Sequence, residues 1–319
     1  MFKTLHNWAE FVKLSHTVFA LPFALASMVV AARENRGWPG WRTFALIVAA
    51  MVCARTCAMA FNRIVDRKFD ALNPRTAGRH LPAGKLSLTS AWTLWVMSAG
   101  GLVAASYFLN RLCFYLSPIG ILVICFYSLT KRFTDYTHVF LGIALALAPI
   151  GAWLAVRGEF GFVPPSDPAM VATRDVIGTW VSHVSTGLVP IVLATVVVFW
   201  LIGFDIIYAL QDYDFDRKHG LRSLVVAWGP KNALRAAFLS HMIMCGLLLV
   251  FGLLCRFRVA YVIGWLLIAL CLALEHWIAR RRSLHWVQNA FFRLNAVVGL
   301  IFLAVTIAEV VFRSGFRIR

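Results

Sequence analysis

Long apolar runs separated by short polar breaks make up nearly the whole chain. Nine of these runs approach 20 residues, the length at which an α-helix crosses the roughly 30 Å hydrocarbon core of a bilayer. The pattern predicts an all-α integral membrane protein, a bundle of nine transmembrane helices forming a single domain over residues 1–319. The predicted spans are residues 14–32, 43–62, 88–109, 112–130, 138–156, 188–210, 233–255, 259–279 and 290–312.

Two of the longer polar breaks, residues 63–87 and 211–232, resemble each other in layout. Each follows a predicted span, opens with spaced aspartates, then becomes basic and ends at a glycine or proline. This likeness predicts two pseudo-repeated halves, spans 2–5 and spans 6–9, since related units recur along a chain at a fixed period. It also predicts an active site at the helix ends on one face of the membrane.

Composition supports a membrane protein, and the distribution of charge predicts its orientation. The chain is 61% hydrophobic and only 14% charged, whereas soluble domains carry about 25% charged residues. Its net charge of +17 raises the possibility of nucleic-acid binding. However, the basic residues lie in short loops, and more than half of the 31 lysines and arginines fall on the face that carries both aspartate-rich breaks. This bias predicts that the N-terminus and the aspartates are cytoplasmic. We expect the bacterial inner membrane as the location, with no nucleic-acid partner and no protein partner inferred.

The acidic residues are few and clustered. Six of the 14 fall in two short windows. In the first, Asp66 and Asp70 share a helix face with Asn62, and in the second, Asp212 and Asp216 repeat the same spacing. Tyr208 lies one turn before Asp212, and Asp205 lies two turns before it. Because carboxylates beside a membrane span are costly and usually face a cavity, these residues are candidate catalytic and metal-binding groups.

Two acidic helix faces that meet in a bundle repel each other unless a cation lies between them. Aspartate oxygens suit Mg²⁺, which binds a few carboxylates together with waters and phosphate oxygens. Basic residues follow each window, and a bound diphosphate group would need such hydrogen-bond donors as well as the metal. No histidine or cysteine spacing indicates zinc. The candidate diphosphate-binding residues are Arg75, Arg79, Lys131, Arg132 and Arg222.

Two other interpretations stay open at this point. The windows could be ordinary solvated loops that obey the positive-inside rule. The chain could also be a transporter or channel, in which charged residues of the apolar runs form an ion path. A transporter, however, would place its acidic site near the middle of the membrane rather than at helix ends. The residues that such a path would use are Arg55, Arg293, Glu275 and Glu309.

At these residues the chain resembles the UbiA superfamily of intramembrane aromatic prenyltransferases. The first window and the run from Asn73 to Gly84 resemble the family's first aspartate-rich motif and the segment after it. The resemblance covers nearly the whole chain, although Arg63 stands where many members carry another acidic residue. The matching positions are Asn62, Asp66, Asp70, Tyr127, Lys131, Arg132, Asp205, Tyr208, Ala209, Asp212, Asp216, Gly220 and Ser223.

The resemblance implies Mg²⁺-dependent transfer of a polyprenyl group from its diphosphate to a small aromatic acceptor in respiratory quinone biosynthesis. It is closest to two branches, one acting on 4-hydroxybenzoate for ubiquinone and one on 1,4-dihydroxy-6-naphthoate for menaquinone. The aspartates and Asn62 would hold the metal, and the basic residues would hold the diphosphate. Tyr208 and Tyr127 would stabilise the developing allylic cation, while Asp205 would position either the acceptor hydroxyl or a metal-bound water.

Overall fold

The protein is a bundle of long helices, seen here in a computed structural model that describes residues 11, 19–162, 176–281 and 284–312. Within these residues, eight helices are long and apolar enough to cross a membrane. The predicted first span is represented by the shorter helix α2, Leu21–Ala31, which begins beside Pro22. Proline suits the first turn of a helix because the amide there has no intrahelical partner. Part of that predicted span, residues 14–18, lies outside the described residues.

The first half of the bundle consists of four helices. They are α3 (Trp41–Leu72), α4 (Leu88–Leu109), α5 (Arg111–Phe126, continued by a 3₁₀ turn over Tyr127–Arg132) and α6 (Thr137–Arg157). A single residue, Asn110, separates α4 from α5. Its side chain accepts a hydrogen bond from the Cys113 amide at 2.9 Å and donates to the Leu154 carbonyl at 2.8 Å. This cap starts α5 and also ties the turn to α6.

The second half consists of α8, α10, α11 and α12. Helix α8 (Val176–Ala209) passes through a 3₁₀ turn (Leu210–Asp212) into the short α9 (Tyr213–Lys218). The remaining helices are α10 (Leu224–Leu254), α11 (Val259–Arg281) and α12 (Leu284–Ile307), which ends in a π-helical turn over Ala308–Phe312. Gly229 has a φ of 74° immediately before Pro230, so α10 is kinked there rather than straight.

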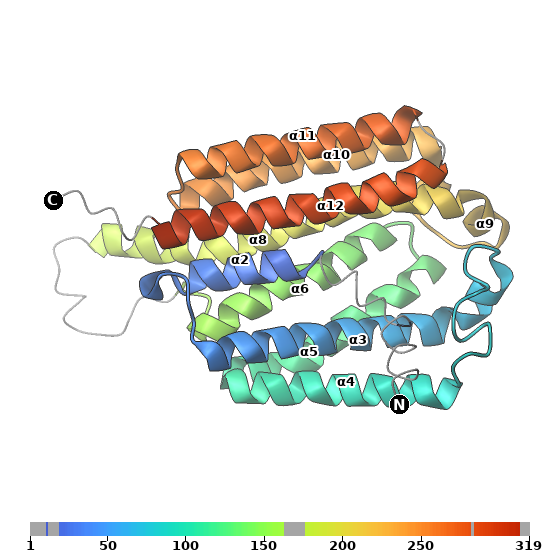
Figure 1. Cartoon of the computed structure of the whole chain (residues 1–319), viewed down its shortest axis with the longest axis horizontal. Coiled ribbons are helices and arrows are strands. Elements are labelled where there is room, and N and C mark those ends of the chain that lie inside the picture. Colours follow the sequence, from blue (N-terminus) through green and yellow to red (C-terminus); the bar gives the residue numbers. More distant parts are fainter. Residues whose placement is uncertain (1–10, 12–18, 163–175, 282–283, 313–319) are drawn as a thin grey trace.

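The halves are joined by α6 and α8, with α2 packed beside them (Figure 1). Gly142 on α6 lies so close to α8 that an added Cβ would stand 2.9 Å from the Val198 carbonyl oxygen. No larger residue fits this crossing without moving one of the two helices. Figure 1 shows α9, the end of α3 and the connection after α3 together at one end of the bundle. Both predicted aspartate windows therefore lie at the same end.

Candidate active site

The first aspartate pair lies on the last turns of α3 and faces an internal cavity. Asn62, Asp66 and Asp70 all line this cavity. The Asn62 amide donates a hydrogen bond to Asp66 Oδ2 at 2.9 Å, as their spacing of four residues permits. Asp70 is buried, and its Oδ2 atom has no hydrogen-bond partner. The helix continues ten residues past the apolar run, so the charged window is helical rather than a loop.

The second aspartate pair is arranged differently, because α8 ends before it. Asp205 and Tyr208 belong to the last turns of α8, Asp212 closes the 3₁₀ turn, and Asp216 lies in α9. All four line the same cavity as the first pair. Asp214, the other acidic residue of this window, is exposed and does not line the cavity.

A basic side chain binds each of the four paired aspartates. Arg75 holds Asp212 through two bonds, from Nε at 2.8 Å and from Nη2 at 2.5 Å. Although burial opposes the charged guanidinium, the hydrogen bonds and charge of Asp212 raise the pKa of Arg75 above its ordinary value. The other pairs are Arg79–Asp70 at 2.6 Å, Lys131–Asp216 at 3.1 Å and Arg132–Asp66 at 3.4 Å.

These pairs connect segments that are distant in sequence. The connection after α3 reaches the second window, where the Asn73 amide also donates to Asp212 at 3.1 Å. The turn after α5 binds both windows, through Lys131 and Arg132. Arg222 is different, because it is not among the residues that line the cavity. Its guanidinium donates to the Phe133 carbonyl at 3.0 Å and its amide to the Lys131 carbonyl at 2.8 Å, so it fixes the turn that carries Lys131.

Beyond the charged residues the cavity is apolar and long. Its volume is about 750 Å³. Along α6 it is lined from Thr137 to Ala155, a helical rise of about 27 Å at 1.5 Å per residue. This length approaches the thickness of a bilayer's hydrocarbon core. A charged mouth therefore opens into an apolar chamber that is long enough to hold an extended hydrocarbon chain.

A profile of the UbiA prenyltransferase family matches residues 20–297. The chain belongs to this family. Curated relatives named 4-hydroxybenzoate octaprenyltransferase include one from Tolumonas auensis, 29% identical over 274 residues that cover 86% of each chain. Another, from Francisella tularensis, is 25% identical over 292 residues that cover 91% of this chain and 90% of the relative.

Solved structures agree with this assignment. The apo structure of a UbiA homologue from Aeropyrum pernix superposes with a TM-score of 0.76 at 30% identity, covering 92% of this chain and 98% of the homologue. A UbiA homologue from Archaeoglobus fulgidus, bound to GPP and Mg²⁺, has a TM-score of 0.68 at 19% identity, covering 96% of this chain and 99% of the homologue. The protein is thus a multi-pass membrane prenyltransferase, as the sequence motifs predicted.

Three residues at this site were not predicted from the sequence as site residues, or were given another role. Asn73 was noted only as part of a motif. Arg55, which sequence analysis attributed to a rival ion path, lines the cavity on α3, and its buried Nε has no hydrogen-bond partner. His138, at the start of α6, binds Asp205 with its Nδ1 atom 2.6 Å from Oδ2. A charged or titratable residue inside an apolar run was the signal available for Arg55 and His138, because such residues usually face a cavity or a partner.

The residues of the rival ion path do not converge. Glu275 accepts a hydrogen bond from Asn295 at 3.0 Å, Glu309 accepts one from the Tyr261 amide at 3.2 Å, and neither lines the cavity. Arg293 is exposed and does not line the cavity either. Only Arg55 of the four reaches it, among the residues that the structure describes.

The residues at the charged mouth fit a magnesium ion that the protein and the substrate bind together. They do not fit a metal ion held by protein side chains alone. Within the described ranges, no group of three or more histidine, cysteine, aspartate or glutamate side chains is arranged to hold a metal ion. Mg²⁺ is usually bound by one or two carboxylates together with substrate phosphate oxygens and waters. The two aspartate pairs supply such carboxylates at one cavity mouth, where Asp70 Oδ2 has no hydrogen-bond partner and lies 3.9 Å from Arg63 Nη1.

Proposed function

We propose that this enzyme transfers a polyprenyl group from its diphosphate to a small aromatic acceptor that carries a hydroxyl and a carboxylate. The observation that carries the proposal is the charged mouth on the 750 Å³ apolar cavity. The mouth suits a diphosphate, and the apolar walls suit a hydrocarbon tail, which gains about 25 cal/mol for each Å² removed from water. The acceptor expected from the relatives' names and from the resemblance is 4-hydroxybenzoate or 1,4-dihydroxy-6-naphthoate.

In this proposal Asp66, Asp70, Asp212 and Asp216 hold Mg²⁺, with Asn62 orienting Asp66. When bound, Mg²⁺ would neutralise the negative charge that builds on the leaving diphosphate. The four basic partners of the aspartates would turn to the phosphate oxygens and stabilise the same charge. Arg222 would act one step removed, by holding the turn that carries Lys131.

The allylic carbon of the donor gains positive charge as its bond to oxygen breaks. Tyr208 and Tyr127 both line the cavity, and aromatic ring faces attract a cation. The Arg75 guanidinium already lies 5.4 Å from the centre of the Tyr208 ring and donates to its hydroxyl at 2.9 Å. Tyr208 therefore lies between the diphosphate-binding residues and the apolar chamber, where the reacting carbon would be.

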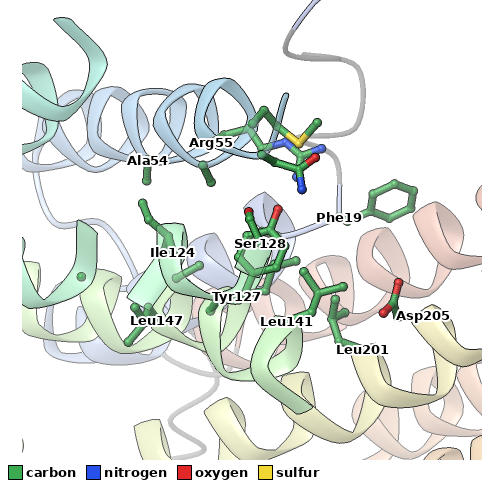
Figure 2. A pocket seen from close by; sticks show the side chains of 18 of the residues that line it. Phe19, Ala54, Arg55, Ile124, Tyr127, Ser128, Leu141, Leu147, Leu201 and Asp205 are labelled. Carbon is green, nitrogen blue, oxygen red and sulfur yellow. The ribbon is translucent and has the colours of Figure 1, made fainter. Parts of the chain in front are cut away.

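Arg55 is the best candidate to bind the carboxylate of the acceptor. It enters the cavity from α3, across from Asp205 on α8, and Tyr127 and Ser128 line the same cavity (Figure 2). A guanidinium in the cavity wall whose buried Nε has no hydrogen-bond partner favours an anionic ligand, since an uncompensated charge is costly away from water. Arginine also offers the forked donors that match a carboxylate.

The proposal places the charged mouth at the cytoplasmic face of a bacterial inner membrane, supported by the excess of basic residues on that side. A single cysteine at the exposed Lys85, in a chain freed of its natural cysteines, would test this orientation. We expect an impermeant thiol reagent to label it in inverted vesicles but not in intact cells.

The decisive experiment incubates membranes that contain the protein with labelled polyprenyl diphosphate and each of the two acceptors separately. We expect prenylated product with at least one acceptor and its loss when EDTA removes divalent metal. Absence of product with both acceptors, together with solute flux in liposomes, would favour the transporter instead.

A further inference from the structure

His138 and Asp205 form a buried side-chain pair beside the cavity. The His138 Nδ1 atom lies 2.6 Å from Asp205 Oδ2. The histidine side chain is fully buried, while 18% of the aspartate side chain is exposed and lines the cavity. Asp205 therefore forms part of the cavity wall, and His138 lies behind it. The other ring nitrogen of His138, Nε2, is buried without a hydrogen-bond partner.

Packing between α6 and α8 holds the pair in place. Gly142, one turn after His138 on α6, allows the close approach to Val198, two turns before Asp205 on α8. At the start of α6 the hydroxyls of Thr137 and Thr130 lie 2.7 Å apart, and both threonines are buried. His138 is thus anchored on both sides along its helix, so its ring is a fixed partner for Asp205.

The partner of Asp205 differs in kind from the partners of the other cavity aspartates. Asp66, Asp70, Asp212 and Asp216 each bind an arginine or a lysine. Arginine and lysine side chains normally stay protonated at neutral pH, whereas an imidazole gains or loses a proton there. Among the aspartates that line the described cavity, Asp205 is the one whose side-chain partner is an imidazole rather than an arginine or a lysine.

We infer that Asp205 is the proton acceptor for the hydroxyl of the aromatic acceptor, and that His138 is its positioning residue. The inference rests on the proposed function. It also favours the first of the two roles that the sequence left open for Asp205, the positioning of the acceptor hydroxyl, because Asp205 lies across the cavity from Arg55 (Figure 2). An acceptor whose carboxylate binds Arg55 would direct its hydroxyl towards the Asp205 side.

The prenyl transfer needs no reactant other than the acceptor and the prenyl diphosphate. Asp205 takes the hydroxyl proton, and the resulting phenolate makes the ring carbon more nucleophilic. That carbon forms a bond to the allylic carbon of the donor while the C–O bond breaks and its electron pair leaves with diphosphate. The ring proton then moves to the oxygen and restores the phenol, and the proton held by the pair passes to water in the cavity. In net terms the acceptor exchanges one proton for the prenyl group.

The test measures kcat and KM for Asp205→Asn, His138→Ala and His138→Gln in purified full-length enzyme. We expect Asp205→Asn to lower kcat about 100-fold, the lower end of general-base effects, with the KM for the prenyl diphosphate unchanged. His138→Ala should lower kcat less. His138→Gln should recover part of that loss, because glutamine can still donate a hydrogen bond to the Asp205 carboxylate.

Acceptor acidity separates a proton-accepting pair from a merely structural one. A ring fluorine beside the hydroxyl, as in 3-fluoro-4-hydroxybenzoate, makes the phenol more acidic and reduces its need for a base. The deficits of Asp205→Asn and His138→Ala relative to the wild type should therefore shrink with this acceptor. Equal deficits with both acceptors, or wild-type kcat in Asp205→Asn, would overturn the inference.

The matched control is His241→Gln, which removes another buried imidazole that lies outside the cavity. Any deficit in this variant should be the same with both acceptors. Failure of the proposed function is recognised separately, because in that case the wild-type enzyme itself would make no prenylated product with either acceptor.

Discussion

Two polar clusters of this enzyme differ in design. The first is the charged mouth of the cavity, where aspartates of both halves pair with three arginines and one lysine. The second, which we call the four-helix polar network, joins α8, α10, α11 and α12. Its members are Trp200, His241, Glu275, His276 and Asn295.

The four-helix polar network is closed to the cavity except through the Trp200 ring, as far as the described residues show. The Trp200 indole donates to Asn295 at 2.7 Å, and Asn295 donates to Glu275 at 3.0 Å. Bonds of this kind hold membrane helices together. The charged mouth, in contrast, presents its ion pairs to a large cavity. Access to a cavity therefore distinguishes the reactive cluster from the structural one.

The largest effect is expected at the charged mouth. Asp66→Ala and Asp212→Ala should each lower prenyl transfer by at least about 100-fold, as is typical when a group that stabilises charge in the transition state is removed. Membrane insertion should persist. The matched control is Asp214→Ala in the same window, because Asp214 is exposed and outside the cavity wall. Retained turnover in either cavity variant would refute the two-window site.

Arg55→Gln should act on the acceptor alone. Loss of a charged hydrogen bond of about 1.5–3 kcal/mol corresponds to a rise of about 10- to 100-fold in the acceptor KM. The KM for the prenyl diphosphate, measured in the same preparation, is the internal control and should stay at the wild-type value. A change confined to the diphosphate KM would instead assign Arg55 to the donor.

Lys131→Ala should raise the KM for the prenyl diphosphate by about tenfold, because it removes one charged contact of about 1.5 kcal/mol from the diphosphate. The exposed Lys218, which follows the second window but does not line the cavity, provides the matched control Lys218→Ala. If both variants keep the wild-type KM, Lys131 is only a membrane anchor at the end of its span.

The smallest effect on turnover is expected in the four-helix polar network. Asn295→Ala leaves the Trp200 indole and Glu275 without their partner, which should cost about 1–3 kcal/mol of stability. Thermal unfolding in detergent would measure this loss, while kcat per folded molecule should stay unchanged. A fall in kcat with normal unfolding would mean that the network contributes to the chemistry.

Hydropathy predicted where the membrane helices lie but not where they end. The apolar run 43–62 is only part of α3, because the charged window after it remains helical and faces the cavity. Similarly, α8 begins twelve residues before its predicted span and α10 nine residues before, the latter with the kink at Gly229. Polar residues that face a cavity or lie at the helix ends lower the local hydropathy and are left out of a predicted span, although the helix continues through them.

For the active site, the sequence predicted the aspartates but not their partners. The i, i+4 spacing of Asp66 and Asp70 is local, and the helix that contains both residues keeps them on one face. Which base binds which aspartate depends on tertiary structure, as Arg75 shows by crossing from the first half to Asp212 in the second. Arg222 could not be separated from Arg75 and Arg79 in the sequence, yet it lies outside the cavity wall.

The ion pairs at the cavity mouth have a consequence for how the metal and the diphosphate bind. Each of the four aspartates is paired with a base before any ligand is present, and Arg63 adds a second base 3.9 Å from Asp70. Binding is then an exchange of partners, in which the metal takes the aspartates while the phosphate oxygens take the bases. Magnesium alone or diphosphate alone completes only one side of this exchange and leaves the other side uncompensated. Each should consequently raise the affinity for the other by the same factor, so that the two behave as one joint ligand.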